Sequence, residues 1–503
     1  MSIQTDVIVI GAGIGGLTAA ALLQERGIRT VVFEKNGFPG GSCASFRRNG
    51  YTFDAGASVF YGFSDNDRSG TLNLHTRIFR KLGVAVEIVP DPVQIHYHLP
   101  NGFSVAASYD RQQFLDSLVM RFPREREGIM RFYQELEDVY DILSSLPAGS
   151  LEDAVHLASV GGRFPVKTFM LALKTFRSMG KTARRYISNE ELLRFIDIES
   201  YSWAVQDAIS TPLVNAGICL ADRHHGGINY PLGGSGRIPE ALCEGIGKFG
   251  GSVRYRTEVT EIVVENGTAT GVRLSDGEVV RAEAVITNAT VWDTFNRLIA
   301  DKRYRVPEDR FLRAPSWFQL FLGVDAGVIP GGFNVHHILV DDWKTFDSLG
   351  GTIYFSAPSL LDPSLAPSGK HAVHAFVTSE TALWEQYEPG SAAYREAKER
   401  FADSIIARTE KILPGLAQAV ELKILATPQT HERYLNRYKG SYGALLKPGQ
   451  NILQKPQNRT PVSNLFATGD STFPGQGVIA VTYSGVSCAS LVARRMGKPL
   501  DYL

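Results

Sequence analysis

Long apolar runs are missing from this sequence. No uncharged apolar stretch approaches the roughly 18 residues that a membrane-spanning helix requires, so we expect no helix that crosses a bilayer. The first residues, MSIQTDVIVIG, also lack the basic and apolar regions of a signal peptide. We therefore expect neither a signal nor a transit peptide, and we expect any contact with a membrane to be peripheral.

An excess of charge of either sign is absent too, since 52 Lys and Arg residues balance 52 Asp and Glu residues. This balance excludes the overall positive field of many nucleic-acid-binding proteins, and we expect no nucleic-acid partner. The four cysteines are scattered without a CxxC pair: Cys43, Cys219, Cys243 and Cys488. Their spacing argues against a cysteine zinc site and favours a reducing intracellular compartment.

The beginning of the chain carries a complete nucleotide-binding pattern. Asp6–Ile10 (DVIVI) predicts a strand buried on both faces, Leu17–Glu25 predicts a helix, and Arg29–Phe33 predicts a second strand that ends at Glu34. A GxGxxG motif stands between the first strand and the helix: Gly11, Gly13 and Gly16. Such glycines let the backbone approach a pyrophosphate, the helix N-terminus attracts it, and the acid about 20 residues further on binds ribose hydroxyls.

A GxGxxG motif alone also occurs in ordinary tight turns, so it is the combination with strands, helix and acid that favours a dinucleotide. This segment does not separate NAD from FAD. Two further glycine-rich segments follow, Pro39–Ser42 (PGGS) and Gly50–Gly56 (GYTFDAG), and as local structure they predict two turns flanking a hairpin. Together they resemble the extended signature of flavoproteins of the amine oxidase and carotenoid desaturase type, which implies FAD.

The C-terminal segment resembles the closing FAD motif of the same flavoproteins. Asn464–Thr468 predicts a strand, a glycine-rich loop follows, and Val478–Val492 predicts an apolar helix. The resemblance implies that Asp470 binds the ribityl chain and that the helix N-terminus after Gly477 faces the flavin and the pyrophosphate. It also implies that the backbone near Val259 lies against the adenine. The predicted cofactor residues are Gly11, Gly13, Ile14, Gly15, Gly16, Glu34, Lys35, Gly40, Gly41, Ser42, Val259, Gly469, Asp470, Gly477, Val478 and Ile479.

These motifs predict an α/β fold with two interleaved domains. We expect a Rossmann-like FAD-binding domain of the glutathione reductase and amine oxidase type, built from residues 1–75, 229–300 and 455–503. Gly251–Asn288 predicts a meander of hairpins within it, with turns at Asn266-Gly267 and Asp276-Gly277. We expect residues 76–228 and 301–454 to form a substrate domain with a mixed β-sheet and a helical, membrane-facing lobe.

Several stretches resemble carotenoid isomerases, and the similarity covers nearly the whole chain. They are Phe53–Ser58, Pro90–Gly102 (PDPVQIHYHLPNG), Asp222–Gly234 (DRHHGGINYPLGG), Asn288–Thr294 (NATVWDT) and Asp470–Gly485 (DSTFPGQGVIAVTYSG). One departure is Gly40–Phe46, which reads GGSCASF where the family often has GGSAGYF; it concerns the subfamily and not the cofactor. The resemblance implies conversion of poly-cis-lycopene (prolycopene) to all-trans-lycopene with reduced FAD and without net redox change.

Three alternatives stay open at this point. The first is an FAD-dependent carotenoid desaturase that passes electrons to a quinone or oxygen, and the second is a carotenoid or flavin binding protein without turnover. The third is an amine oxidase, which requires an aromatic cage for the amine beside the flavin; the sequence places none. No residue is identifiable as a catalytic acid or base, and the sequence does not reveal the oligomeric state.

Four histidines raise the question of a metal site. His96 and His98 alternate in a predicted strand and so face one side, and His224 and His225 are adjacent. No carboxylate or cysteine joins them at ligand spacing. We expect them to satisfy hydrogen bonds or to shape a pocket, and we predict no metal.

A basic segment, residues 154–188, contains no Asp or Glu. Its basic residues are Arg163, Lys167, Lys174, Arg177, Lys181, Arg184 and Arg185, and they alternate with apolar residues such as Phe169 and Phe176. This composition predicts a basic amphipathic helix on an anionic membrane surface, although a solvated helix packed on the core by one face has the same pattern. Because a carotenoid is almost insoluble in water, we expect peripheral binding to the cytoplasmic side of a bacterial plasma membrane or to a thylakoid membrane.

Overall fold

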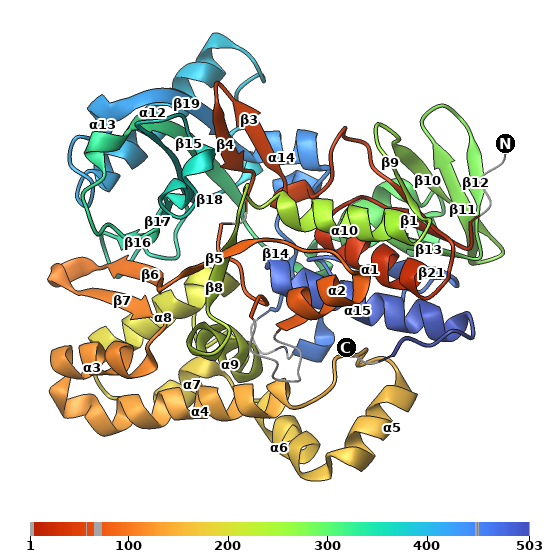
Figure 1. Ribbon diagram of the computed structural model, residues 1–503, viewed down its shortest axis with the longest axis horizontal. Helices are drawn as coiled ribbons and strands as arrows, with labels where there is room; N and C mark the ends of the chain where they lie inside the picture. Colours follow the sequence, from red (N-terminus) through yellow and green to blue (C-terminus); the bar gives the residue numbers. More distant parts are fainter. Residues whose placement is uncertain (1–4, 57, 65–72, 448–449, 451, 502–503) are drawn as a thin grey trace.

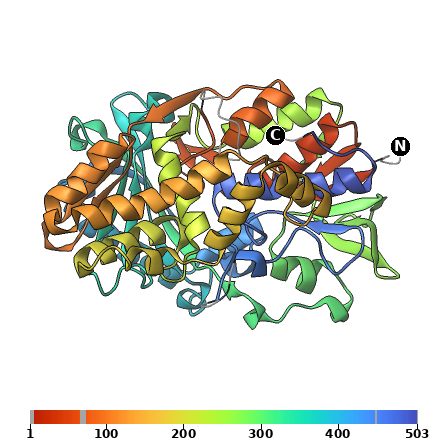
Figure 2. The same ribbon diagram turned by 90° about the horizontal axis from the view of Figure 1, so that it is seen from below.

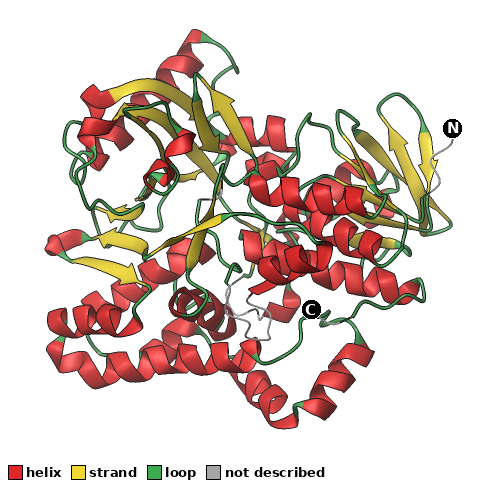
Figure 3. Ribbon diagram, in the orientation of Figure 1, coloured by secondary structure: helices red, strands yellow, loops and turns green. Residues whose placement is uncertain are grey.

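The computed structural model describes residues 5–56, 58–64, 73–447, 450 and 452–501. Two sheet-based regions lie side by side in Figure 1, and a layer of helices runs along the lower edge. Figure 3 shows the same division by secondary structure, with most strands in the upper half and the helical layer below them. In the view from below, these helices (orange to yellow) lie nearest to the viewer (Figure 2).

The first region is built on a parallel sheet. Within the described residues its strand order is β21-β13-β1-β2-β9, and each pairing is parallel. The strands are β1 (Val7–Ile10), β2 (Thr30–Phe33), β9 (Ser252–Arg254), β13 (Ala284–Thr287) and β21 (Leu465–Ala467). The N-terminal and C-terminal segments of the chain therefore share one sheet, as the resemblance implied.

Both faces of the parallel sheet are covered, which explains why β1 is apolar throughout. Val7 and Val9 pack against α1 (Ile14–Glu25), α10 (Arg237–Lys248) and α15 (Val478–Arg495). Ile8 and Ile10 pack against a second, antiparallel sheet of β10 (Val259–Glu265), β11 (Thr268–Leu274) and β12 (Val279–Arg281). The predicted meander is therefore correct for its middle strands, while β9 and β13 at its ends join the parallel sheet instead.

The second region is built on a mixed sheet with the order β19-β15-β18-β17-β16-β6-β7 in the described part of the chain. All pairings are antiparallel except the one between β6 and β16, which is parallel. The strands are β6 (Val93–His98), β7 (Ser104–Ser108), β15 (Ser316–Asp325), β16 (His336–Val340), β17 (Thr352–Ser356), β18 (Lys370–Ser379) and β19 (Val420–Ala426).

Helices cover this sheet at two places. Near β15 and β18, one face packs against α12 (Ala392–Thr409) and α13 (Leu416–Ala419). The β6–β7 hairpin packs on the helical layer along the lower edge of Figure 1. That layer comprises α3 (Arg111–Arg121), α4 (Arg126–Ser144), α5 (Ala154–Arg163), α6 (Pro165–Thr175), α7 (Met179–Ala183), α8 (Glu190–Ala204) and α9 (Leu213–Ala221).

The remaining short elements lie outside these sheets and the helical layer. β5 (Ile88–Asp91) pairs with β8 (Ile228–Pro231) in an antiparallel ribbon that links the predicted substrate and cofactor segments. The others are β3 (Ser45–Arg48), β4 (Tyr51–Asp54), α2 (Leu74–Leu82), α11 (Val291–Asp293), β14 (Leu312–Arg313), α14 (Pro428–Leu435) and β20 (Ala444–Leu445). The domain division and its limits stay a prediction.

The basic segment differs from its prediction. It forms three helices, α5, α6 and α7, because the chain turns at Phe164, whose backbone leaves the helical region just before Pro165. Lys174 is buried and pairs with Glu135 at 2.7 Å, so it does not belong to an exposed basic face. Among the helices of the described residues, none is both long enough and apolar enough to cross a bilayer.

Candidate active site

A cavity of about 610 Å³ lies between the parallel sheet and the mixed sheet. Its first part is lined by the turns at the carboxyl ends of β1 and β2, the place where open α/β sheets bind ligands. Its second part is lined by side chains of β15 to β18 and of the helical layer. Of the predicted cofactor residues, every one except Gly16 lines this cavity.

The glycine turn brings backbone N–H groups to the cavity. Gly11 has φ +91°, a conformation that favours glycine, and its N–H donates to the carbonyl of Phe33 at 2.8 Å. No side chain caps the N-terminus of α1 at Gly13, so the first N–H groups of the helix are available to a ligand. A Cβ on Gly13 would lie 2.4 Å from Nδ2 of Asn288, which also lines the cavity.

Gly16 has a packing role. A Cβ at this position would lie 2.5 Å from the carbonyl oxygen of Gly11, so only glycine lets α1 approach β1 this closely. A similar contact joins the helices, because a Cβ on Gly485 would lie 2.6 Å from the carbonyl oxygen of Gly15. These contacts fix the N-termini of α1 and α15 at the same cavity.

Glu34 and Lys35 follow β2 and both line the cavity. The two carboxylate oxygens of Glu34 accept hydrogen bonds from the backbone N–H groups of Ala12 and Asn36, each at 2.8 Å, which fixes the acid beside the glycine turn. Nζ of Lys35 donates to Oδ1 of Asn436 at 2.7 Å, and burial lowers the pKa of this amine. Glu34 therefore stands where a ribose is expected, whereas the amine of Lys35 is held by α14 and its C-terminal turn.

The PGGS turn and β10 complete this part of the wall. Gly40 has φ +110°, and a Cβ there would lie 2.9 Å from the backbone nitrogen of Ala44. Gly41 and Ser42 border the cavity from the same turn, and Val259 borders it from the first residue of β10.

The C-terminal motif forms the opposite wall, with Gly469, Asp470, Gly477, Val478 and Ile479. No side chain caps α15 at Gly477, so a second helix N-terminus offers free N–H groups to the cavity. Two uncapped helix N-termini, a fixed acid and a wall of glycines fit a dinucleotide that carries a pyrophosphate.

Arg437 was missed by the sequence analysis. Its guanidinium forms an ion pair with Asp470, donates to Oγ of Ser42 at 3.4 Å and lies 4.3 Å from the centre of the Tyr442 ring. Arg437 follows α14, in a segment without a recognisable motif. Only the fold shows that this residue joins the PGGS turn to the C-terminal motif.

The second part of the cavity is aromatic, and the sequence analysis missed it as well. Tyr354 and Phe376 stack at 5.2 Å, and Trp317 meets both rings edge to face at 5.4 and 5.3 Å. Trp203 and Val205 line it from the end of the helical layer. Side chains alternate between the two faces of a strand, and this alternation is visible in the sequence. It does not show which face of the sheet borders a cavity.

Four buried polar atoms of the cavity wall have no hydrogen-bond partner among the described residues. They are Nε1 of Trp203, Oε1 of Gln319, Nε2 of His336 and Oε1 of Gln476. Buried polar groups are normally satisfied, so these four atoms are exceptions in the wall of the cavity.

Asp91 and His336 form a buried pair at the edge of the aromatic part. Nε2 of His336 lies 3.6 Å from Oδ2 of Asp91, and its Nδ1 forms a hydrogen bond of 2.9 Å with Oγ of Ser356. Burial raises the pKa of Asp91 to about 7 and lowers the pKa of His336 to about 3. His336 is therefore neutral near pH 7, while Asp91 changes between its protonated and charged forms in this range.

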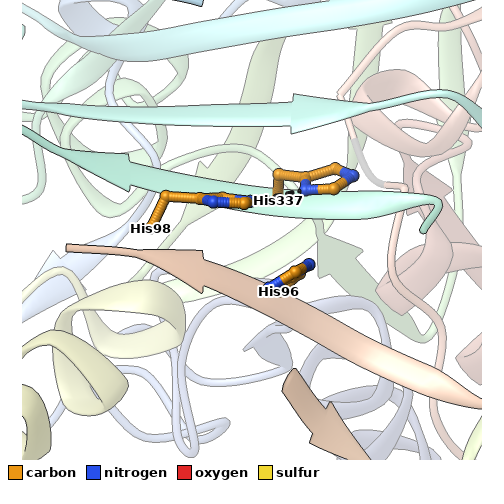
Figure 4. A group of neighbouring side chains, drawn as sticks. All are labelled: His96, His98 and His337. Carbon is orange, nitrogen blue, oxygen red and sulfur yellow. Dashed lines mark hydrogen bonds between the residues drawn. The ribbon is translucent and has the colours of Figure 1, made fainter. Parts of the chain in front are cut away.

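The four histidines of the sequence analysis fall into two places. His224 and His225 lie in the helical layer, where Nε2 of His225 contacts Glu137 at 2.7 Å and Nδ1 of His224 contacts the carbonyl of Tyr109 at 3.1 Å. His96 and His98 lie on β6 and converge on His337 of β16, which the sequence analysis did not single out (Figure 4).

Comparison with known proteins places this geometry in a family. The family model described as flavin containing amine oxidoreductase matches residues 14–493. "Prolycopene isomerase, chloroplastic" of Arabidopsis thaliana is 42% identical over 499 residues, which cover 98% of this chain and 83% of that protein. "Phytoene desaturase (neurosporene-forming)" of Cereibacter sphaeroides is 28% identical, over 99% of this chain and 97% of that protein.

Among solved structures, putrescine oxidase bound to putrescine superposes with a TM-score of 0.64 at 15% identity, covering 98% of this chain and 100% of that one. At this identity the likeness concerns the fold alone. The family match over nearly the whole sequence leads to one conclusion: the chain belongs to the flavin containing amine oxidoreductase family.

Proposed function

We propose that this protein is an FAD-dependent carotenoid isomerase that converts poly-cis-lycopene to all-trans-lycopene without net redox change. The observation that carries the proposal is one cavity in which a dinucleotide cradle adjoins an aromatic, largely apolar chamber. The relatives support the reaction, because identity is 42% with an isomerase and 28% with a desaturase over nearly the same length.

The cofactor is FAD, and we assign its reduced form as the active one. The N-terminus of α1 binds the pyrophosphate, Glu34 the adenosine ribose and Asp470 the ribityl chain, while Gly16 acts through packing. The other proposed contacts are Gly11, Gly13, Ile14, Gly15, Lys35, Gly40, Gly41, Ser42, Val259, Gly469, Gly477, Val478 and Ile479. Reduced FAD, when bound, supplies the electron density that lowers the bond order of a polyene double bond.

The chain itself binds the polyene and excludes water. Trp317, Tyr354 and Phe376 offer flat apolar surfaces to a conjugated chain, and Trp203 and Val205 extend this surface towards the helical layer. The positive end of α15 at Gly477 stabilises negative charge on a ring bound beside it.

The decisive experiment is pigment analysis after anaerobic incubation of the protein with liposomes that carry poly-cis-lycopene. With dithionite-reduced FAD and no electron acceptor, we expect all-trans-lycopene to accumulate over many turnovers. A desaturase would instead consume a quinone or oxygen in proportion to product. Retained pigment binding without any reaction would indicate a binding protein, and either result would refute the proposal.

We further propose that the part of the helical layer around α5 and α6 faces a membrane, which would place the protein at the cytoplasmic side of a plasma membrane or at a thylakoid membrane. α5, α6 and the residues around them expose seven large apolar side chains: Val155, Leu157, Val166, Phe169, Met170, Leu173 and Phe176. Five basic side chains of the same segment are exposed: Arg163, Lys167, Lys181, Arg184 and Arg185. This combination suits an anionic bilayer surface.

The position of this surface agrees with substrate entry from the bilayer. α6 packs against α9, and Cys219 of α9 lines the cavity. The helix α9 therefore lies between α6 and the cavity.

A further inference from the structure

Three imidazole rings meet on one face of the mixed sheet, at the place where its only parallel pairing among the described strands occurs. His96 and His98 project to the same side of β6 because they are two residues apart. His337 of β16 pairs in register with His96. One ring nitrogen from each histidine lies within 4.8 Å of the others, and Figure 4 shows the three rings next to one another.

The hydrogen bonds around the rings resemble those that orient metal ligands. Nε2–H of His337 donates to the backbone carbonyl of Asn334 at 2.8 Å, which leaves its Nδ1 unprotonated. This Nδ1 lies 2.9 Å from Nε2 of His98. Nδ1 of His96 contacts the side-chain amide of Asn334 at 3.1 Å, and its Nε2 contacts Oγ of Ser104 at 2.8 Å. A backbone carbonyl that fixes the tautomer of a histidine is a common outer-shell partner in metal sites.

The charge of the group suits a cation. An ordinary imidazole is largely neutral at pH 7, and the neutral ring is the form that binds metals. In the described part of the chain, the group of ligand atoms contains imidazole nitrogen only. Imidazole suits Zn²⁺, Cu²⁺ and Ni²⁺, whereas Mg²⁺ and Ca²⁺ require oxygen ligands.

We propose that His96, His98 and His337 form a binding site for a divalent first-row transition metal, with Zn²⁺ as the ion of first choice. Tetrahedral zinc with nitrogen ligands places the donor atoms about 3.3 Å apart. Nδ1 of His337 and Nε2 of His98 are already near this separation, at 2.9 Å. When the metal binds between them, the proton of His98 moves from Nε2 to Nδ1, so that the ring stays neutral and Nε2 binds the metal. His96 completes the set by a rotation that exchanges one of its hydrogen bonds for a metal bond.

The proposed ion cross-links β6 to β16. These two strands pair over a short stretch, from His96 to His98, and the β6–β7 hairpin carries part of the helical layer. Bound metal therefore stabilises the junction between the mixed sheet and that layer. With three protein ligands, a water molecule occupies the fourth position.

Zinc binding to the flavin-loaded full-length protein tests the proposal. After dialysis against a chelator, ZnCl₂ is titrated by calorimetry, and bound zinc is counted by elemental analysis. We expect one Zn²⁺ per chain, a rise in melting temperature on binding, and no effect of MgCl₂. For His98→Asn, which removes a ligand, we expect affinity to fall by more than the roughly 10–100-fold that loss of an outer-shell partner costs.

His371→Gln is the matched control. His371 is another partly buried strand histidine, and it contacts Ser359 away from the cluster. Its substitution should leave zinc binding unchanged. Equal zinc affinity in His98→Asn and the unsubstituted protein would overturn the proposal, as would a melting temperature that zinc leaves unchanged in both. Retained flavin in His98→Asn establishes that the variant is folded.

Discussion

At the scale of single residues, Asp91 is a carboxyl group that folding removes from water. Because burial raises its pKa from 3.8 to about 7, the folded state keeps a proton that the unfolded state releases. Binding of this proton at Asp91 increases the free energy of unfolding. This contribution is fully present below pH 3.8 and is lost as the pH rises through about 7. Each pKa unit corresponds to about 1.4 kcal/mol, so the loss above pH 7 amounts to at most about 4 kcal/mol.

Asp91→Asn should therefore stabilise the protein at pH 8 and have little effect at pH 4. In the unsubstituted protein, the backbone N–H of Val93 donates to Oδ1 of Asp91 at 3.0 Å. Oδ1 of the new amide still accepts this hydrogen bond. The measurement is the melting temperature of both proteins between pH 4 and pH 8, with the surface substitution Glu385→Gln as control. A difference between Asp91→Asn and the original protein that does not grow with pH would contradict the raised pKa.

Residues whose position depends on local chain geometry were predictable from the sequence. Gly11 and Gly13 occupy the turn after β1, and Glu34 lies at the end of β2, because each position is defined within one strand-turn-helix unit. Arg437 and His337 were not predictable. Each has a partner hundreds of positions away in sequence, Ser42 for Arg437 and His98 for His337, and only strand pairing and tertiary packing bring them together.

At the scale of elements, the crossing of α1 and α15 decides whether two helix N-termini face one ligand. A Cβ at Gly485 would lie 2.6 Å from the carbonyl of Gly15 and 2.7 Å from Cβ of Thr18. Gly485→Ala should force the helices apart at a cost of about 1–3 kcal/mol. We expect a lower melting temperature and a several-fold lower flavin content after purification, read from the absorbance ratio of flavin to protein.

Gly247→Ala provides the matched comparison. Gly247 lies in α10, and an added Cβ would meet no atom within 4 Å. Since alanine favours a helix over glycine by about 0.5–1 kcal/mol, this variant should be slightly more stable and should keep its flavin. If both variants retain flavin equally, the close crossing of α1 and α15 is not what assembles the cofactor site.

The exposed surface of α5 and α6 permits a direct test of membrane binding. Phe169 and Phe176 are 66% and 71% exposed, and burying such a side chain contributes roughly 1.5–3 kcal/mol. The double substitution Phe169→Ser, Phe176→Ser should reduce co-sedimentation with anionic liposomes by at least about tenfold. Binding of the unsubstituted protein should also weaken as salt rises, because Arg163 and Lys167 contribute through charge.

Met120→Ser is the control for this experiment, since Met120 is 80% exposed on α3 and lies outside the basic segment. It should bind liposomes as the original protein does. Unchanged liposome binding by the double variant would assign membrane contact to another surface. Absence of binding by the original protein would leave the apolar side chains of α5 and α6 as a solvent-exposed face.

At the scale of the whole molecule, the sequence predicted the nucleotide-binding half of the fold better than the other half. Gly11, Glu34 and Asp470 belong to motifs with a fixed place in a parallel sheet, so the joining of the two chain ends could be inferred. The mixed sheet has no such motif. Its β6 and β16 are separated in sequence by the whole helical layer and by β9 to β13, and nothing in the local pattern of either strand identifies the other as its partner.

The joining of distant segments around one cavity predicts how the cofactor affects the stability of the entire protein. Glu34 and Val259 line one part of the cavity, and Asp470 and Gly477 line another, so a ligand that spans both parts holds together segments from the beginning, middle and end of the chain. A ligand at 100 times its dissociation constant stabilises the folded state by about 2.7 kcal/mol.

FMN lacks the adenosine half of FAD, so it cannot reach Glu34 and Val259 while its ring lies at Gly477. Added to the flavin-free protein at equal concentration, FAD should therefore raise the melting temperature clearly more than FMN does, and it should protect all three segments from limited proteolysis. Equal shifts from FAD and FMN would mean that the glycine turn of β1 and the acid at Glu34 do not bind the nucleotide.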